Sequence, residues 1–434
     1  MTRFRCVTFG CRVNQYETQA IREQLVSRGY VEASEGSSPD LVVINSCTVT
    51  EAADRECVAF VRALHRDHPD ARIVLTGCLV QRDSEVLKKL PGVRLLAGSN
   101  QKHRIADLIE ELDPWAADPK IEIELERVYA PLSISTFAER SKAFVKVQDG
   151  CDRACAFCKI PLVRGRSRSR PLKDILDEVQ RLVSHGFQEV VLTGVALGLW
   201  GKEWDPPGSL ADLILAVDQL PGRFRIRLSS LDPRDLDDRL IDAFRSSKRL
   251  CRHLHLSLQS GSDPVLDRMN RGYTKSEYRI WVQGIRRFWP DLGLTTDIIV
   301  GFPGETQGQF QEVLDFCREL VFAKVHVFPY SRRRGTSAWF FKEQVPAPII
   351  KERARLLRRA AGEGAAQFRI RFVGTVQEVL LEEGRVGYTG QFLKVHLSTP
   401  VDPVGRLYPV RLTGTAPEGL LGEVVNFSGG TLDN

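Results

Sequence analysis

The sequence contains no long apolar run. None of its stretches approaches the roughly 20 consecutive apolar residues that a helix needs to cross a bilayer, and the opening segment MTRFRCVTFG has no apolar signal-peptide core. There is also no low-complexity tract and no convincing short-period repeat. These absences argue against a membrane-spanning or secreted protein, so we expect a cytoplasmic protein with no membrane partner.

Charge of one sign is in little excess. The 61 Lys and Arg residues face 55 Asp and Glu residues, and the formal net charge of +6 permits a nucleic-acid partner without indicating one. A chain of 434 residues, 43% hydrophobic and 27% charged, is typical of a globular protein with about two to four domains. Because no export signal is present, we expect the ten cysteines to be reduced, which favours metal binding or catalysis over disulfides.

Residues 1–113 alternate short apolar strands with amphipathic helical stretches. Strands rich in Val, Ile and Leu that are separated by helices indicate an α/β domain with a parallel, doubly wound sheet. The four predicted strands are Arg5–Gly10, Leu41–Ser46, Arg72–Gly77 and Val93–Gly98. Residues 114–140, which contain Asp118-Pro119 and Pro131, are predicted to be a connector.

A second alternating series fills residues 141–345. Six β/α repeats are too few for a standard eight-stranded barrel, so the pattern predicts an open (β/α)6 partial barrel. Right-handed crossovers would place all six carboxyl ends on one face. The predicted strands lie near Ala143–Gln148, Gln188–Thr193, Phe224–Ser229, His253–Ser257, Leu294–Val300 and Ala323–Phe328.

The C-terminal part begins with a basic helical connector over residues 346–373. Residues 374–434 then contain short Val- and Leu-rich runs broken by glycines, a pattern that predicts a small antiparallel β-barrel. The charge is unevenly spread, because residues 323–375 carry a net +9 and residues 374–434 a net −3.

Cys151, Cys155 and Cys158 form a C-x3-C-x2-C loop directly after the first strand of the predicted barrel. Three thiolates at this spacing can surround one metal or cluster and leave a fourth position open, whereas disulfides within so short a loop would be strained. The loop also lies where barrel enzymes build their active sites. A zinc knuckle that lacks its fourth ligand is the alternative.

Cys11, Cys47 and Cys78 form a second, scattered set. Each lies at or just beyond the carboxyl end of one of the first three predicted strands, and such ends converge on one edge of a parallel sheet, where ligand sites form. The alternative is that they are buried free cysteines with no ligand. The remaining cysteines lack such a placement and are interpreted as packing residues: Cys6, Cys57, Cys251 and Cys317.

The two cysteine sets together resemble the radical S-adenosylmethionine methylthiotransferase family. The Cys151 loop matches the superfamily signature C-x3-C-x-aromatic-C, with Phe157 as the aromatic residue. Further segments match nearly end to end, and the C-terminal barrel resembles the family's TRAM domain, an OB-like RNA-binding module. The matching segments are Gly10–Thr18 (GCRVNQYET), Asn45–Val49 (NSCTV), Gly77–Gln81 (GCLVQ), Ser257–Ser262 (SLQSGS), Gly301–Glu305 (GFPGE) and Phe328–Ser331 (FPYS).

This resemblance implies two [4Fe–4S] clusters. The catalytic cysteines Cys151, Cys155 and Cys158 would hold the cluster whose open iron binds S-adenosylmethionine, which serves both as radical source and as methyl donor. The set Cys11, Cys47 and Cys78 would hold a second cluster that carries or supplies sulfur. An unactivated C–H bond is beyond side-chain acid–base chemistry, so a cofactor must perform the difficult step. An external electron donor such as flavodoxin or ferredoxin, and a sulfur source, are further implied partners.

Branches of the family differ in substrate. They act on isopentenyl-adenosine in tRNA, on threonylcarbamoyl-adenosine in tRNA, or on an aspartate of ribosomal protein S12. Val13–Thr18 and His253–Gly261 resemble the threonylcarbamoyl-adenosine branch, which implies methylthiolation at C2 of N6-threonylcarbamoyladenosine-37 in the tRNA anticodon stem-loop. The other substrates remain alternatives, as does a non-enzymatic, metal-stabilised RNA-binding protein. Ala196 and Lys159 depart from the family pattern.

Further candidate site residues follow from their places in the predicted barrel. Five lie at strand ends or late in strands on the expected active face, where they would contact the cofactor or simply satisfy turns; they are Gly194, Ser230, Gln259, Asp297 and Gly301. Two arginine runs are predicted to contact RNA phosphates, with a solvated surface as the alternative; they are Arg164, Arg166, Arg168 and Arg170, and Arg332, Arg333 and Arg334.

Overall fold

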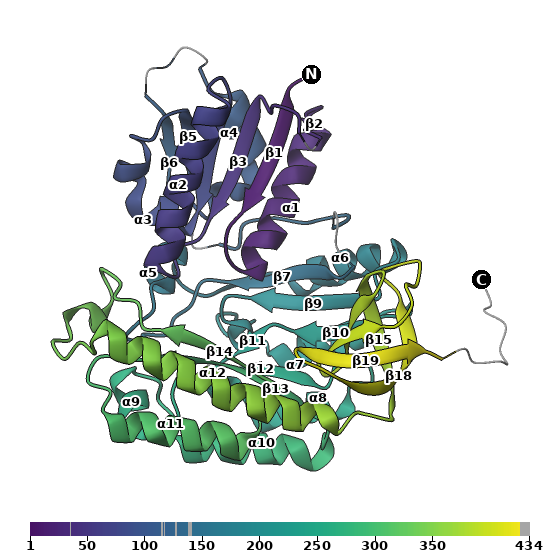
Figure 1. Ribbon diagram of the computed structural model, residues 1–434. Coiled ribbons are helices and arrows are strands. Elements are labelled where there is room, and N and C mark those ends of the chain that lie inside the picture. The colour runs from purple at the N-terminus through teal and green to yellow at the C-terminus, as the bar shows by residue number, and fades with distance from the viewer. Residues whose placement is uncertain (35, 114–115, 117, 126–127, 138–140, 426–434) are drawn as a thin grey trace.

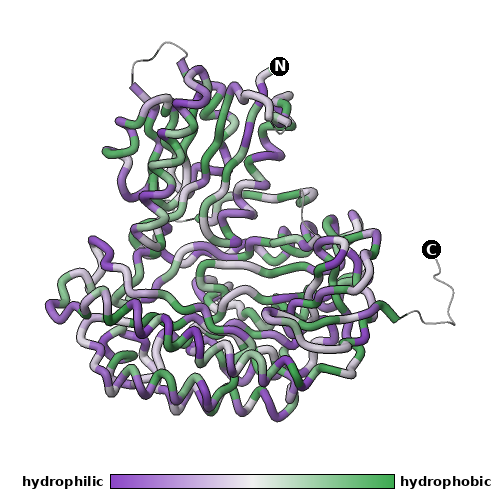
Figure 2. The backbone as a smooth tube through the Cα atoms, viewed as in Figure 1, coloured by the Kyte–Doolittle hydropathy of each residue, from purple (hydrophilic) through white to green (hydrophobic). Residues whose placement is uncertain are grey.

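The computed structural model describes residues 1–425 except 35, 114–115, 117, 126–127 and 138–140. An N-terminal α/β sheet stands on a larger partial barrel, and a small C-terminal barrel packs against one end of it (Figure 1). Hydrophobic residues concentrate along the strands in the interior of each part (Figure 2). Among the described residues, no helix combines the length and the apolar character that a membrane span requires.

The N-terminal sheet is parallel throughout, in the order β2-β1-β3-β4-β5-β6. β3 (LVVINS) is buried along its whole length because helices cover both faces, which confirms the doubly wound prediction. The elements are β1 (Arg3–Thr8), α1 (Arg12–Ser27), β2 (Val31–Glu32), β3 (Leu41–Ser46), α2 (Glu51–Asp67), β4 (Arg72–Gly77), α3 (Cys78–Leu87), β5 (Val93–Ala97), η1 (Gln101–Arg104), α4 (Ile105–Glu110) and β6 (Lys120–Glu122).

The predicted connector 114–140 is more than a connector. Its residues Lys120–Glu122 form β6, which pairs with β5 and completes the edge of the sheet. This strand is short and half polar, so it gives no apolar run in the sequence. The N-terminal sheet therefore extends past residue 113.

The central domain is an open partial barrel of six β/α units, as predicted. β7, β9 and β10 form one parallel series and β11 to β14 the other, while a bridge from Ile226 to Leu250 joins them. Helices α7, α10 and α11 each begin at a capping box, where a Ser or Thr side chain satisfies the first free N–H groups. The elements are β7 (Ala143–Asp149), α5 (Ile160–Arg164), β8 (Arg168–Ser169), α6 (Leu172–Ser184), β9 (Glu189–Gly194), η2 (Leu197–Leu199), α7 (Leu210–Asp218), β10 (Arg225–Leu228), β11 (Ser230–Leu231), η3 (Pro233–Asp235), α8 (Asp238–Ser246), β12 (His253–Leu256), α9 (Asp263–Arg268), α10 (Lys275–Phe288), β13 (Gly293–Val300), α11 (Gln307–Leu320), β14 (Lys324–Pro329) and η4 (Ser337–Phe340).

The C-terminal barrel is closed, in the order β15-β16-β17-β19-β18. It differs from the antiparallel prediction at one seam, because β17 and β19 pair in parallel. Two neighbouring parallel strands cannot be joined by a tight turn. The chain therefore passes through β18 between β17 and β19, and β18 provides the crossover connection. The elements are α12 (Ala347–Ile370), β15 (Val376–Glu383), β16 (Val386–Thr389), β17 (Lys394–Leu397), β18 (Leu407–Ala416) and β19 (Gly419–Val424).

A buried carboxylate connects the two barrels. Glu189, at the start of β9, accepts hydrogen bonds from Arg225 Nε at 2.6 Å and from Arg227 Nε at 2.8 Å. The same guanidinium groups donate to backbone carbonyls of the C-terminal barrel, including Tyr388 O at 2.9 Å and Thr389 O at 3.0 Å. Arg227 also lies over the ring of Phe392, with Cζ 5.0 Å from its centroid. Glu189 thus neutralises the cations that hold the C-terminal barrel in place.

The Glu189→Ala variant is expected to lose about 3–5 kcal/mol of unfolding free energy, because two buried guanidinium groups would lose their counter-charge. Denaturant unfolding measures this loss. The exposed pair of Arg223 and Glu378 provides the control, and Arg223→Ala should change stability by no more than about 0.5 kcal/mol. Equal stabilities of the two variants would show that Glu189 does not hold the barrels together.

Candidate functional site

The structure brings the three N-terminal cysteines to one edge of the sheet. Cys11, Cys47 and Cys78 follow β1, β3 and β4. The chain before Cys11 passes so close to Cys47 that a Cβ on Gly10 would lie 2.7 Å from the Cys47 Sγ. Gly10 also has φ of +100°, so glycine is required there on both counts. Burial raises the pKa of Cys47 to about 11, and the neighbouring Cys78 adds to the rise.

Arg164, at the end of α5, connects this edge to the central barrel. Its Nε donates to Cys78 Sγ at 3.3 Å, and its Nη2 donates to Asn14 Oδ1 at 2.7 Å. Its Nη1 bonds Glu17 Oε1 of α1 at 2.8 Å and Asp149 Oδ1 of β7 at 3.0 Å. One buried guanidinium therefore contacts a cysteine of the N-terminal set and carboxylates from both domains.

Two lysines complete this buried charge network, which we define as Glu17, Lys102, Lys146, Asp149 and Arg164. Lys102 bonds Glu17, and Lys146 donates to Glu17 at 2.7 Å and to Asp149 at 2.6 Å. Burial alone would raise the pKa of Glu17, but Arg164 and the two lysines lower it well below its usual range. Three cations against two carboxylates give the network one excess positive charge, and one of these cations, Arg164, contacts the sulfur of Cys78.

Sequence analysis missed most of this network, and the prediction for Arg164 was wrong. Its guanidinium is buried among protein partners instead of facing RNA phosphates. A usable signal was present in β7, where Lys146 interrupts the apolar run AFVKV. A lysine in a strand that is buried on both faces requires a carboxylate partner.

Three further arginines of the predicted RNA set are also buried. Arg168 donates to Asn100 Oδ1 at 3.1 Å, and Arg170 donates to Glu178 Oε2 at 3.0 Å. Arg333 donates to Asp54 Oδ2 and to Thr48 Oγ1, both at 2.7 Å. Phosphate contacts by these three are therefore rejected. The exposed members of the two runs are Arg166, Arg332 and Arg334.

The Cys151 loop offers hydrogen-bond donors to its sulfur atoms. The backbone N–H groups of Arg153 and Ile160 donate to Cys151 Sγ at 3.4 Å and to Cys158 Sγ at 3.5 Å. Arg271 Nη1 donates to Cys155 Sγ at 3.2 Å. Donors aimed at sulfur stabilise thiolates and are typical of the surroundings of iron–sulfur clusters.

The spacing of the thiol groups does not match zinc. Tetrahedral zinc with Zn–S bonds of about 2.3 Å would bring its sulfur ligands to within roughly 4 Å of one another. In the described part of the chain, the one group of three potential ligands that all lie within 4.8 Å is His255, Asp297 and His326. Neither cysteine set is that tight, which favours a larger cluster at both.

A cavity of about 210 Å³ lies between the two cysteine sets. Cys78 lines it from the N-terminal sheet and Cys158 from the barrel loop. Of the five predicted cofactor residues, Gln259 and Asp297 line this cavity; Gly194, Ser230 and Gly301 are not part of its lining. The residues that line the cavity between the cysteines include Thr48, Ile160, Ile299, Phe328, Tyr330 and Ser331.

Gly301 has a structural reason to be glycine. Its φ is +73°, and a Cβ there would lie 2.4 Å from the side chain of Ile350 in α12. Its N–H donates to Glu305 Oε2 at 3.0 Å. The close packing of α12 therefore accounts for this residue without a cofactor contact.

The structure gives a local environment for each of the two departures from the family pattern. Lys159 lines the cavity, and burial together with Arg82 and Arg333 lowers its pKa to about 8. Ala196 contributes its backbone, since its N–H donates to Gln148 Oε1 at 2.8 Å. Because this hydrogen bond uses the backbone N–H, it forms even though alanine replaces the polar residue that is usual in the family at position 196.

The four remaining cysteines belong to neither set. Cys57 and Cys317 are buried in apolar clusters, Cys251 is buried beside Arg225 and Arg227, and Cys6 is half-buried. Burial raises the pKa of both Cys6 and Cys57 to about 12, so neither forms a thiolate readily. Their surroundings support packing roles.

Family models match two parts of the chain. The model described as the radical SAM superfamily matches residues 145–317, and the one described as uncharacterized protein family UPF0004 matches residues 3–98. The structure is also similar to that of the radical S-adenosylmethionine methyltransferase TsrM from Kitasatospora setae, with a TM-score of 0.55 and 15% identity over 78% of this chain and 77% of that one. At this identity the likeness concerns the fold alone.

Full-length relatives are more similar in sequence. The threonylcarbamoyladenosine tRNA methylthiotransferase MtaB of Chlamydia pneumoniae is 40% identical over 97% of this chain and 98% of its own length. The protein of the same name from Thermotoga maritima is 37% identical over 97% and 96%. The tRNA-2-methylthio-N(6)-dimethylallyladenosine synthase of Clostridium novyi is 32% identical over 98% and 96%.

The Arg164→Met variant is expected to lose about 3–5 kcal/mol of unfolding free energy, because Glu17 and Asp149 would remain buried with less counter-charge. Denaturant unfolding measures the loss, and iron bound after anaerobic reconstitution should also fall. Arg166→Met, at an exposed arginine two residues away, is the matched control and should change neither quantity. A stable Arg164→Met protein with full iron content would contradict the role given to the network.

Proposed function

The chain belongs to the radical S-adenosylmethionine methylthiotransferase family, and on that premise we propose that it adds a methylthio group to C2 of N6-threonylcarbamoyladenosine-37 in tRNA. The observation that carries the proposal is the cavity lined by Cys78 on one side and Cys158 on the other. A sulfur-supplying site and a radical site must reach the same carbon atom, so they must open into one chamber. The relatives at 40% and 37% identity favour the threonylcarbamoyl substrate over the dimethylallyl one.

The donor sets fit two [4Fe–4S] clusters. Cys151, Cys155 and Cys158 would hold one and leave an iron open for S-adenosylmethionine, while the three N-terminal cysteines would hold the other. When bound, these groups supply the radical chemistry, the sulfur and the methyl group. Thiolates are the ligands that such soft metal sites prefer.

The chain itself provides the charge balance and a sheltered chamber. Arg164 of the buried charge network places a cation next to Cys78, and Arg271 provides another cation at Cys155. Ile299 and Phe328 give the chamber an apolar wall, which limits the access of water to the reacting atoms. These residues position and shield the reaction without taking part in it.

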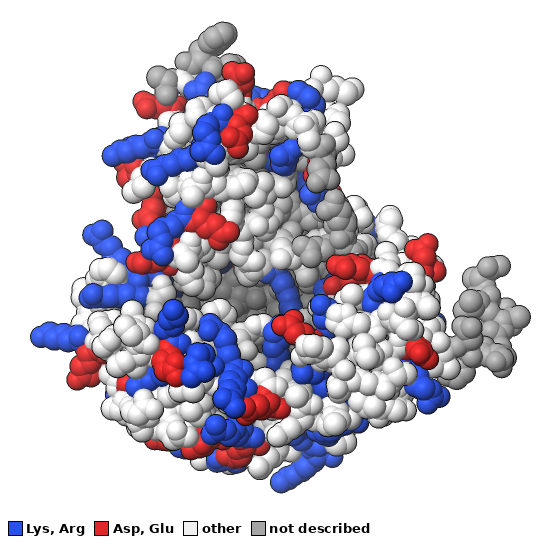
Figure 3. Space-filling model, viewed as in Figure 1, with Lys and Arg blue, Asp and Glu red and all other residues white. Residues whose placement is uncertain are grey.

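The RNA would approach the chamber from the hollow between the N-terminal domain and the barrel. Figure 3 shows this hollow, with Lys and Arg side chains gathered on its barrel side. Arg166, Arg332 and Arg334 are exposed and remain the proposed phosphate contacts of the two arginine runs. We infer that the partners are the tRNA anticodon stem-loop, an electron donor such as flavodoxin or ferredoxin, and a sulfur source, all met in the cytoplasm.

The substrate can be identified with anticodon stem-loop RNAs that differ only at position 37. Reconstituted protein with S-adenosylmethionine and a reductant should convert the threonylcarbamoyl-adenosine RNA to its methylthio derivative, detected by mass spectrometry of the digested nucleosides. RNA with isopentenyl-adenosine should react at least about tenfold less efficiently, since a difference of roughly 1.4 kcal/mol corresponds to that ratio. Preferred reaction of the isopentenyl RNA, or of a ribosomal-protein aspartate, would contradict the proposal.

The two cysteine sets should be separable by mutation. Cys47→Ala is expected to reduce bound iron from about eight to about four atoms per chain, because the Cys151 loop has its own ligands. This variant should still form 5′-deoxyadenosine but give no methylthiolated RNA. Cys57→Ala is the control and should keep the iron, because that thiol is packed within α2 against the apolar core of the N-terminal domain. Full methylthiolation by the Cys47→Ala protein would rule out a second cluster in sulfur transfer.

A further inference from the structure

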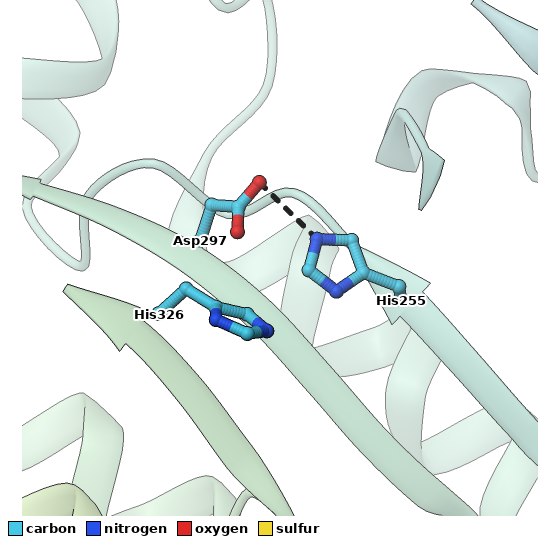
Figure 4. Close-up of side chains that lie close together, drawn as sticks. All are labelled: His255, Asp297 and His326. Carbon is cyan, nitrogen blue, oxygen red and sulfur yellow. Dashed lines mark ion pairs between the residues drawn. The ribbon is translucent and has the colours of Figure 1, made fainter. Parts of the chain in front are cut away.

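Three polar side chains meet inside the partial barrel, and two of them, both histidines, have no assigned role. His255, Asp297 and His326 come from the neighbouring strands β12, β13 and β14, and Asp297 is the direct register partner of His326. Figure 4 shows the two imidazole rings beside the carboxylate, with His255 Nε2 at 3.2 Å from Asp297 Oδ2. Because Asp297 also lines the cavity between the cysteine sets, this group lies beside the reaction chamber.

Within this group of three side chains, His255 is fixed by hydrogen bonds and His326 is not. Thr295 Oγ1 lies 3.0 Å from His255 Nδ1 and 3.0 Å from His253 Nε2, which fixes the His255 ring. His326, by contrast, has no hydrogen-bond partner among the described residues. Burial lowers the pKa of His326, so at neutral pH its ring has one nitrogen that donates and one that accepts.

Arg12 adds an unpaired cation to the same interior. Its guanidinium Cζ lies 5.9 Å from the ring centroids of both Phe144 and Phe392, and it forms no hydrogen bond or ion pair with any described residue. Arg12 is partly buried and forms no ion pair with a described carboxylate, whereas the buried Arg164 and Arg227 both have carboxylate partners.

Shared neighbours place Arg12 near the histidine group. The ring of Phe392, which Arg12 contacts, lies 4.9 Å from the ring of His253, and His253 shares Thr295 with His255. The charge of Arg12 also contributes to the lowered pKa of His326. The interior of the barrel therefore contains an acceptor that lines the cavity, an imidazole on the neighbouring strand and, within electrostatic range of that imidazole, a cation with no ion-pair partner among the described residues.

Resting on the proposed function, we propose that Arg12, Asp297 and His326 form the subsite for the threonine-derived substituent of the substrate adenosine. Arg12 would pair with the carboxylate of that substituent, and Asp297 would accept a hydrogen bond from its N–H or hydroxyl group. His326 would bond its carbonyl oxygen or its hydroxyl group. The anionic substituent supplies the counter-charge that Arg12 lacks in the protein alone.

The subsite would also exclude the wrong substrate. An isopentenyl group has no polar atom, so it would leave Arg12, Asp297 and His326 desolvated and unpaired. A site built for polar contacts rejects an analogue that lacks them much more strongly than an apolar site rejects an added polar group. The three side chains therefore serve as specificity determinants, separate from the cluster ligands.

The test compares two anticodon stem-loop RNAs, one with threonylcarbamoyl-adenosine and one with its carboxylate converted to a methyl ester. Wild-type holoenzyme should show a KM at least about tenfold lower for the acid than for the ester, as expected for loss of one charge-assisted contact. Arg12→Gln should raise KM for the acid by about 10- to 100-fold and leave KM for the ester unchanged. Arg12→Lys should restore part of the preference, and His326→Phe should weaken binding of both RNAs.

Iron content measured on each variant shows whether the neighbouring Cys11 still binds its cluster. Arg22→Gln, in the same helix α1, is the matched control and should keep the preference for the acid. A preference retained by Arg12→Gln, or equal use of acid and ester by the wild type, would overturn the subsite while leaving the proposed function intact. If the wild type reacted with the isopentenyl RNA but with neither the acid nor the ester of the threonylcarbamoyl RNA, both the subsite and the proposed function would be overturned.

Discussion

One buried guanidinium determines how the two domains meet. Arg164 ends α5, the short helix that follows the Cys151 loop, and it bonds Glu17 of the N-terminal domain, Asp149 of the barrel and the sulfur of Cys78. A planar fork with five donors satisfies such a set in one orientation only. Any rotation between the domains would leave charges buried and unpaired, so the network fixes the distance between the two cysteine sets.

The same network favours the chemistry of the site. Its Arg164 cation lies beside the sulfur of Cys78. At the other set, backbone N–H groups of the Cys151 loop and the side chain of Arg271 donate hydrogen bonds to the cysteine sulfur atoms. Two clusters with thiolate ligands bring negative charge into a chamber of low polarity, and these fixed donors offset it without reorganisation. The proposed substrate subsite uses Asp297, which lines the chamber, together with His326 and Arg12, so positioning and recognition would use different side chains.

The sequence allowed the sheets and both cysteine sets to be predicted, because continuous apolar runs such as LVVINS mark buried parallel strands and the cysteines follow them directly. The polar strand β6 and the parallel seam of the C-terminal barrel gave no such signal. Arg164 was misassigned because its partners Asp149 and Glu17 lie 15 and 147 residues away, and an alternating arginine run looks the same whether it is solvated or buried. Arg12 was missed because its significance lies in the absence of a partner, which only packing reveals.

The most direct test of this account is the nucleoside content of tRNA from cells that lack their own methylthiotransferase for threonylcarbamoyl-adenosine and express this chain instead. Mass spectrometry of the digested tRNA should show 2-methylthio-N6-threonylcarbamoyladenosine in place of its unmodified precursor. Persistence of the precursor at full level, with methylthio groups found only on isopentenyl-adenosine, would contradict the account.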